Sequence, residues 1–147
     1  MAAPVTFETF QQELTSLVAR FDREHAHFTN PDYNEAMVRE DFLNPFFRAL
    51  GWDVGNSKGL IHTEREVDIE VRTALSGKQT RADYVFRVAR VERFTCEAKK
   101  PAEKLHSDHR KSNECVFGFY APKHKLSPLW RHVWCNYPQL FPHAKLV

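Results

Sequence analysis

The sequence is poor in the features that would place it outside the ordinary globular proteins. Its 147 residues contain no apolar run near the ~18 that a membrane-spanning helix needs, and the first residues show no basic leader followed by an apolar core. Its three cysteines are odd in number and lack paired spacing, which fits a reducing cytoplasm better than a disulfide framework. A hydrophobic content of 42% and a charged content of 27% exclude collagen-like and plainly disordered chains.

An excess of charge of one sign is also missing, because the formal net charge of +2 is too small to indicate nucleic-acid binding by itself. The charge is nevertheless distributed unevenly. Residues 1–104 hold 15 Lys/Arg and 17 Asp/Glu, a net of −2, whereas residues 105–147 hold 6 and 2, a net of +4, with five of the eight histidines. We therefore predict one domain over residues 1–104 and a tail of different character over residues 105–147.

Two helices are predicted in the first third of the chain. Residues 6–27 carry apolar side chains at spacings of three and four, which is typical of an amphipathic helix. Asn34 is a suitable cap for a second helix from about 35 to 50, and Gly51 is a suitable stop. Pro45 lies inside this second helix and should bend or interrupt it.

Strands are predicted between residues 60 and 100. Residues 66–71 alternate polar and apolar side chains, as a half-buried strand should, and 76–78 form a turn. Two further β-rich runs, 82–88 and 93–99, are joined by a short polar connection at 89–92. The order of elements predicts a mixed α/β (α+β) domain with helices packed on a small mixed sheet.

Three charged residues on the last two predicted strands can support phosphodiester chemistry. Glu97 and Lys99 are one residue apart, so both side chains point to the same face of a strand. Asp83 begins the preceding strand, and a short hairpin would bring its carboxylate beside that of Glu97. Two converging carboxylates suit Mg²⁺, and a lysine beside the ion can position or deprotonate water and stabilise charge on a phosphorane.

The Asp…Glu-X-Lys spacing alone is a weak signal, because a solvated strand face with an ordinary Glu/Lys pair gives the same pattern. Its flanks strengthen it, since Glu97 follows the apolar run 94–96 and ends a buried strand. A charged group in that position needs a partner, because burying it unpaired is costly.

Four segments in order, 34–54, 66–70, 81–87 and 94–101, resemble the N-terminal PD-(D/E)XK nuclease domain of type IIG and related type I restriction endonucleases. The resemblance covers about residues 30–104. It implies a restriction-endonuclease-like core and a Mg²⁺-dependent DNA endonuclease of a restriction-modification system, which defends against foreign DNA. Methyltransferase and specificity modules would be its partners, and no membrane would be involved.

The resemblance also assigns roles to individual residues. Asp83 and Glu97 would be the Mg²⁺ ligands, Lys99 would complete the catalytic set, and Glu35 would be the family's helical acidic residue. Arg39 lies one helical turn after Glu35, where it would orient that carboxylate or contact phosphate; a surface ion pair between the two is an equal alternative.

Several neighbouring charged residues have weaker expected roles. Lys100 is a candidate contact to the DNA backbone, and Glu40 is a second choice for the helical acid. A solvated strand face, with a role around the metal as the alternative, is expected for Glu66, Asp68 and Glu70.

The resemblance stops after Lys104. The nuclease domains continue with a helix carrying Gln and Tyr, and residues 105–147 show neither this helix nor a persistent period. The segment is either a divergent basic, aromatic-rich ending that contacts nucleic acid or, as we favour, a truncated or frame-shifted end. It also contains metal-capable residues whose spacing matches no familiar zinc pattern: His106, His109, Cys115, His132, Cys135 and His143. The competing function is therefore a catalytically inactive remnant that binds only DNA or a partner.

Overall fold

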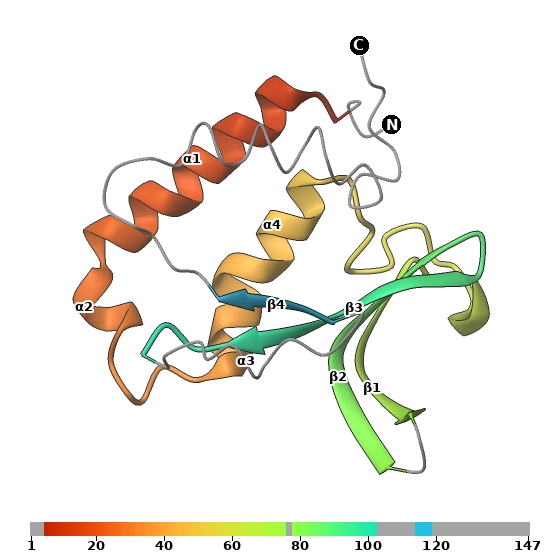
Figure 1. Ribbon diagram of the computed structural model, residues 1–147. Helices are drawn as coiled ribbons and strands as arrows, with labels where there is room; N and C mark the ends of the chain where they lie inside the picture. Colours follow the sequence, from red (N-terminus) through yellow and green to blue (C-terminus); the bar gives the residue numbers. More distant parts are fainter. Residues whose placement is uncertain (1–4, 76–77, 103–113, 119–147) are drawn as a thin grey trace.

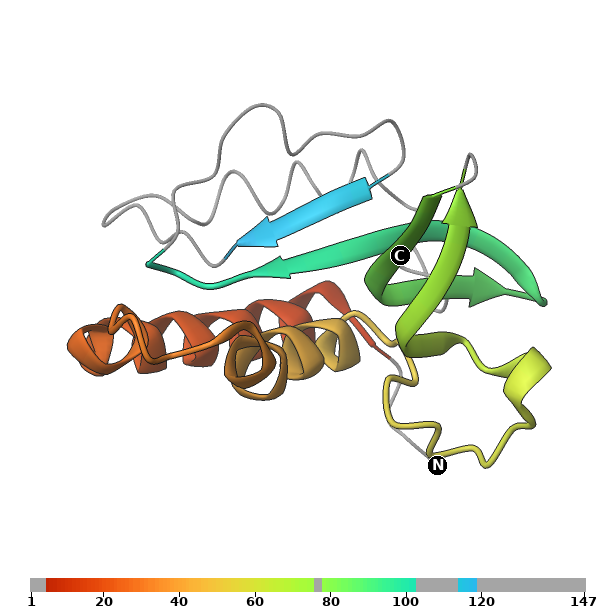
Figure 2. The same ribbon diagram turned by 90° about the horizontal axis from the view of Figure 1, so that it is seen from below.

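The computed structural model describes residues 5–75, 78–102 and 114–118. These residues form two layers, in which helices cover one face of a sheet (Figure 1, Figure 2). The mixed α/β class predicted from the sequence is confirmed at this level. Among the described residues, no helix is long and apolar enough to cross a bilayer.

The first helix, α1, runs over Phe7–Arg23 and begins at a capping box. The Thr6 side chain accepts a hydrogen bond from the Thr9 N–H, and the Thr9 hydroxyl oxygen accepts one from the Thr6 N–H, which satisfies two N-terminal donors. The helix ends earlier than the predicted residue 27, because the backbone leaves helical geometry at Glu24 before the short α2, His25–Phe28. The buried face of α1 carries Phe10, Leu14, Leu17 and Phe21.

The second predicted helix is also present, in three consecutive pieces. These are α3 (Glu35–Val38), the π-helical turn η1 (Arg39–Leu43) and α4 (Asn44–Ala49). The Asn34 side chain caps the start by accepting from the backbone N–H three residues later. Gly51 follows the end with φ 96°, a left-handed conformation that glycine adopts without strain.

Pro45 explains why this helix changes pitch. Proline has no N–H, so the helical hydrogen bond to the carbonyl of Asp41 cannot form. The Arg20 Nη1 donates to that carbonyl instead, at 3.3 Å. One residue earlier, the N–H of Asn44 reaches back five residues to the carbonyl of Arg39, which makes the wide π turn. The predicted bend is thus a wide turn that begins at Arg39.

In the described part of the chain, the sheet has four strands in the order β1-β2-β3-β4. β1 (Val67–Leu75), β2 (Lys78–Val88) and β3 (Val91–Lys99) form an antiparallel meander, and β4 (Glu114–Gly118) pairs parallel to β3. The first three strands are the ones predicted from alternation and β-propensity. The fourth was not predicted, and it lies beyond residue 104.

The β2–β3 hairpin turns through two residues, Ala89 and Arg90, which connect the paired Val88 and Val91. Both turn residues have positive φ, 50° and 69°, as a tight turn that matches the twist of the strands requires. The short connection expected over 89–92 is therefore confirmed, although neither turn residue is the glycine or asparagine that usually signals it.

β2 and β3 stop pairing with each other before either strand ends. Their paired residues stop at Tyr84 and Cys96, after which β2 continues beside β1 while β3 continues beside β4 (Figure 1). We call this point the strand fork, and Asp83 and Glu97 lie one residue beyond it on each strand. Opposite residues of an antiparallel pair share a face, so the fork places both acids on the same side of the sheet.

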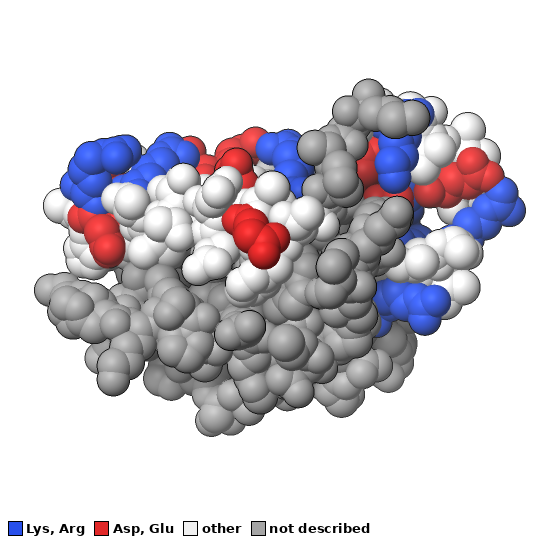
Figure 3. Space-filling view, turned by 90° about the horizontal axis from the view of Figure 1, so that it is seen from above, with Lys and Arg blue, Asp and Glu red and all other residues white. Residues whose placement is uncertain are grey.

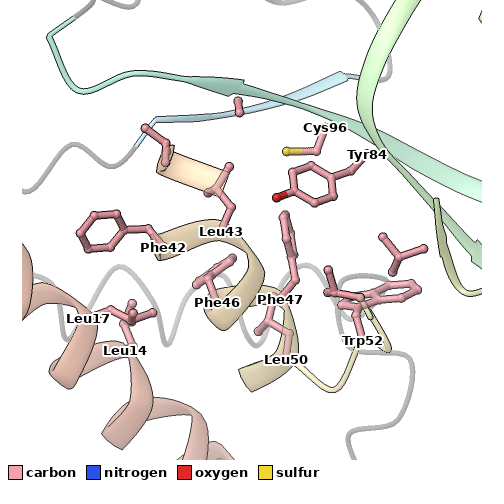
Figure 4. Packing of buried hydrophobic residues seen from close by; sticks show 14 of the residues in the cluster. Leu14, Leu17, Phe42, Leu43, Phe46, Phe47, Leu50, Trp52, Tyr84 and Cys96 are labelled. Atoms are coloured by element: carbon pink, nitrogen blue, oxygen red, sulfur yellow. The ribbon is translucent and has the colours of Figure 1, made fainter. Parts of the chain in front are cut away.

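The core lies between the helices and the face of the sheet that carries Tyr84 and Cys96. Figure 4 shows side chains from α1, η1 and α4 meeting this face. Trp52, 2% exposed, closes one end of the cluster and packs edge-on against Phe86 at 4.9 Å between ring centroids. Burial of so many large side chains accounts for the stability of this layer pair.

In the connection between α4 and β1, the Asp53 carboxylate accepts several hydrogen bonds. Asp53 accepts hydrogen bonds from the N–H groups of Ser57 and Lys58 at 2.7 and 3.1 Å and from the Ser57 hydroxyl at 2.8 Å. Lys58 in turn contacts Glu66 at 2.5 Å, and the short 3₁₀ turn η2 (His62–Glu64) precedes β1. Asp53 therefore shapes the segment that delivers the chain to the sheet.

Some sequence predictions fall outside the described residues. The turn residues Ser76 and Gly77 are among them, as is most of residues 105–147, including every histidine of that segment. The boundary after residue 104 stays a prediction, with β4 as the described part of the chain beyond it.

Candidate functional site

Asp83 lies at the strand fork and uses both carboxylate oxygens. Its Oδ2 accepts the backbone N–H of Ala98 at 2.7 Å, and its Oδ1 accepts from Arg39 Nη1 at 2.9 Å. The N–H of Ala98 points toward β2, where strand pairing has stopped, so the Asp83 side chain replaces a missing ladder bond. Asp83 thus contacts the strand that carries Glu97, while the predicted approach of the two carboxylates to each other stays a prediction.

Lys99 and Glu97 are in direct contact, as their one-residue spacing predicts. Lys99 Nζ lies 2.7 Å from Glu97 Oε1 and 3.5 Å from Glu35 Oε1. Only 13% of the Lys99 side chain is exposed, so its ammonium group is held between two carboxylates in a partly desolvated position. The first turn of α3 supplies Glu35, and the site thus joins the helix start to the end of β3.

Arg39 lies between two carboxylates from neighbouring strands. Its Nη1 contacts Asp83, and its Nη2 contacts Glu70 Oε1 at 2.8 Å, with 14% of the side chain exposed. Burial by itself would lower the pKa of Arg39, but the hydrogen bond to Glu70 and the charge of Asp83 raise it above its ordinary value. Arg39 therefore binds carboxylates of β1 and β2. One of the two sequence alternatives had paired it with Glu35 instead.

Glu70 joins the group from β1, where it faces Asp83. The strand pairs on either side are Ile69 with Tyr84 and Val71 with Ala82, which leaves Glu70 opposite Asp83. Its φ of 58° is left-handed, an uncommon conformation for a residue with a side chain inside a strand. The sequence placed Glu70 on a solvated strand face, and its 44% exposure agrees, yet it has a specific partner.

A buried polar chain supports β2 next to Asp83. The Tyr84 hydroxyl donates to Asn44 Oδ1 at 2.7 Å, and Asn44 Nδ2 donates to Glu40 Oε1 at 3.0 Å. Burial raises the pKa of Tyr84 well above its ordinary value, so its hydroxyl stays a donor. Glu40, the second choice for the helical acid, is thereby engaged with Asn44, whereas Glu35 reaches Lys99.

The expectation of a solvated strand face is wrong for Asp68. Its side chain is 5% exposed, forms an ion pair with Arg87 of β2 and lies 3.6 Å from His62 Nδ1. The reason is cross-strand: Asp68 pairs with Val85, which places Arg87 within diagonal reach. Glu66 has a structural role as well, because it accepts the Asp53 N–H and contacts Lys58.

The strand fork carries two carboxylates, Asp83 and Glu97, of the oxygen-donor type that a magnesium ion takes. Among the described residues no group of three or more His, Cys, Asp or Glu side chains could hold a metal. Mg²⁺ does not require such a group, because it is usually bound through one or two carboxylates and keeps several waters. Asp83 and Glu97 provide two, and each Asp83 oxygen has a second lone pair beyond the hydrogen bond it accepts.

Of the predicted site residues, the structure brings Glu97, Lys99 and Glu35 into contact and binds Asp83 to Arg39, and sequence reasoning missed the Glu70 contact. The available signal was its spacing, but Glu66, Asp68 and Glu70 recur at every second position of the sequence and cannot be told apart by pattern. Lys100 follows Lys99 and is half-buried. On the described part of the face in Figure 3, acidic and basic side chains are interspersed.

No family model matches the chain, and no solved structure matches it. The chain is similar to the type II restriction enzyme and methyltransferase RM.Eco57I of Escherichia coli, with 36% identity over 94 residues. The matched segment makes up 63% of this chain and 9% of that protein. The similarity links the chain to restriction-modification proteins. The chain spans only a small part of the length of the relative that it matches.

Proposed function

We propose that this chain carries a Mg²⁺-dependent endonuclease site of the PD-(D/E)XK type, which hydrolyses DNA phosphodiester bonds in a restriction-modification system. The observation that carries the proposal is the group at the strand fork, where Lys99 contacts Glu97 beside Asp83. The similarity to a restriction enzyme and methyltransferase supports the reaction class.

Asp83 and Glu97 would hold the ion, since both are hard oxygen donors and lie one residue beyond the fork. When bound, Mg²⁺ supplies Lewis-acid polarisation of the phosphate, a more acidic water and charge neutralisation at the leaving oxygen. The Ala98 N–H and Arg39 fix the orientation of the Asp83 carboxylate before any ion arrives. Such preorganisation avoids part of the ordering cost in the transition state.

Lys99 is the residue that faces the developing negative charge. In hydrolysis the oxygen of water joins phosphorus, the bond from phosphorus to the leaving oxygen breaks, and the water loses a proton as the leaving oxygen gains one. The Lys99 ammonium group orients the water and stabilises the extra charge on the phosphorane. Glu97 and Glu35 hold this ammonium group in place, at 2.7 and 3.5 Å.

Sequence specificity would come from other parts of the system. Contacts to phosphate position a protein on DNA, whereas contacts to base edges select the site. Lys100, next to the catalytic lysine, is the candidate for a backbone contact, and methyltransferase and specificity modules are the proposed partners. Arg39 contacts two carboxylates. We therefore assign it to orienting Asp83 and not to binding phosphate.

The test is cleavage of supercoiled plasmid by the purified chain with Mg²⁺ or with EDTA. We expect Asp83→Asn, Glu97→Gln and Lys99→Ala each to lower the nicking rate by about 100-fold or more, as removal of a charged transition-state contact does. Glu92→Gln is the matched control, because Glu92 lies on the same strand and is exposed.

Equal cleavage by the unchanged chain and the three variants would refute the catalytic assignment. Absence of cleavage by every protein, with DNA binding retained, would instead favour the inactive remnant.

A further inference from the structure

The guanidinium group of Arg39 binds two carboxylates of the candidate site, Asp83 and Glu70. Nη1 takes one oxygen of Asp83 and Nη2 takes one oxygen of Glu70, at 2.9 and 2.8 Å. A guanidinium fork that has a single carboxylate in reach tends to bind it with two parallel hydrogen bonds. Glu70 therefore determines how much of Asp83 the arginine occupies.

The backbone around Glu70 is arranged to make this contact. Its left-handed φ of 58° interrupts β1 between two regular strand pairs, at the position across from Asp83. A left-handed conformation is unfavourable for a residue with a side chain and persists where the surroundings hold it. One contact that holds Glu70 here is the ion pair with Arg39, whose side chain is 14% exposed.

We propose that Glu70 is a positioning residue of the candidate site: by holding one arm of Arg39, it keeps the arginine from closing on both oxygens of Asp83 and so leaves that carboxylate able to bind a divalent cation. This inference rests on the proposed function in one respect, the identification of Asp83 as a cation ligand. It assigns to Glu70 a role through Arg39, without contact to the ion or the DNA.

The test is calorimetric titration of the full chain with Mg²⁺, in the absence of DNA. We expect Glu70→Ala to raise the Mg²⁺ dissociation constant by about tenfold, because an unshared Arg39 then competes for Asp83 and its charge is no longer offset. Glu70→Gln should have an intermediate effect, since its amide oxygen accepts a weaker hydrogen bond. Thermal unfolding checks that each variant folds, and Glu70→Gln retains the shape of the side chain if Glu70→Ala does not fold.

A second background separates positioning from simple loss of negative charge. Arg39→Lys keeps the positive charge but removes the planar fork. In that background we expect Glu70→Ala to raise the dissociation constant by about threefold at most, which is the part due to charge alone. An equal effect of Glu70→Ala with arginine and with lysine would overturn the inference.

The outcome is independent of the cleavage test. Plasmid cleavage that fails while the calorimetric order holds would refute the proposed function and support the role of Glu70. If the chain cleaves plasmid while Glu70→Ala and Glu70→Gln bind Mg²⁺ like the unchanged chain, the proposed function is supported and the role of Glu70 is refuted. Absence of any Mg²⁺ binding by the unchanged chain would overturn the inference directly.

Discussion

The hydrogen bond between Tyr84 and Asn44 links the sheet to α4 immediately beside the strand fork. The donor and acceptor are 2.7 Å apart, with Tyr84 fully buried and Asn44 3% exposed. Tyr84→Phe leaves the Asn44 oxygen without this donor, and we expect a loss of about 1–2 kcal/mol in the free energy of unfolding. Asn44→Leu also removes the donor to Glu40, and we expect a loss of about 2–3 kcal/mol.

A double-mutant cycle isolates the bond itself. Since Tyr84→Phe and Asn44→Leu remove the same interaction, the double variant should be more stable than the sum of the single losses predicts, by about 1–2 kcal/mol. Urea unfolding of the four proteins, followed by circular dichroism, gives the free energies, and an unchanged urea dependence shows that the same surface unfolds. Single losses that add to within about 0.3 kcal/mol would refute this account of the link.

The remaining stability predictions concern pH and two polar contacts. Burial raises the pKa values of Tyr84 and Tyr33 above the ordinary 10.0, so above that pH only the unfolded chain loses these protons. The free energy of unfolding should then fall with rising pH, by up to about 1.4 kcal/mol per pH unit for each tyrosine. Tyr84→Phe should therefore make the urea midpoint fall less steeply between about pH 9 and about pH 11.5. A steeper fall in the variant would contradict this account of Tyr84. Asp41 accepts from both Arg20 and Tyr33 at 3.0 Å, so Asp41→Ala should cost about 1–2 kcal/mol in urea unfolding, and no change would show that solvent replaces these bonds. Although partial burial opposes it, hydrogen bonds from Ser57 and Lys58 lower the pKa of Asp53. Asp53→Ala should therefore speed proteolysis between residues 54 and 65. Acidification through and below pH 3.8 should speed amide exchange in the same segment. Equal cleavage rates of the variant and the unchanged chain would contradict the role of Asp53.

The parts of the site that sequence predicted are those that local geometry determines. One intervening residue on a strand is enough to put Glu97 and Lys99 on one face, and a short hairpin is enough to bring Asp83 near them. Asn34 and Gly51 likewise act within one helical turn of where they occur. These patterns depend on period and chain connectivity, which a single sequence contains.

The parts that sequence did not predict depend on contacts between distant elements. Arg39 and Asp83 are 44 residues apart, and nothing in the helix pattern shows that the π turn directs Arg39 toward the sheet. Asp68 and Glu70 look alike in the alternation of β1, yet one is buried against Arg87 and the other binds Arg39. Such choices are made by cross-strand register and by the fork, which arise only when the sheet is assembled.

β4 shows why residues beyond 104 matter to the candidate site. It pairs with Thr95–Lys99, which includes the residues after Cys96 where β3 is no longer paired with β2, so without β4 that edge of β3 would have unpaired N–H and C=O groups. A chain ending at residue 104 should therefore unfold at lower urea concentration than one ending at residue 118, and should associate at high concentration through the exposed edge. Urea unfolding and sedimentation of the two chains measure this difference. Equal midpoints and equal monomer content would mean that β4 does not stabilise the strand bearing Glu97 and Lys99, whereas the expected difference would make β4 part of the support of the site.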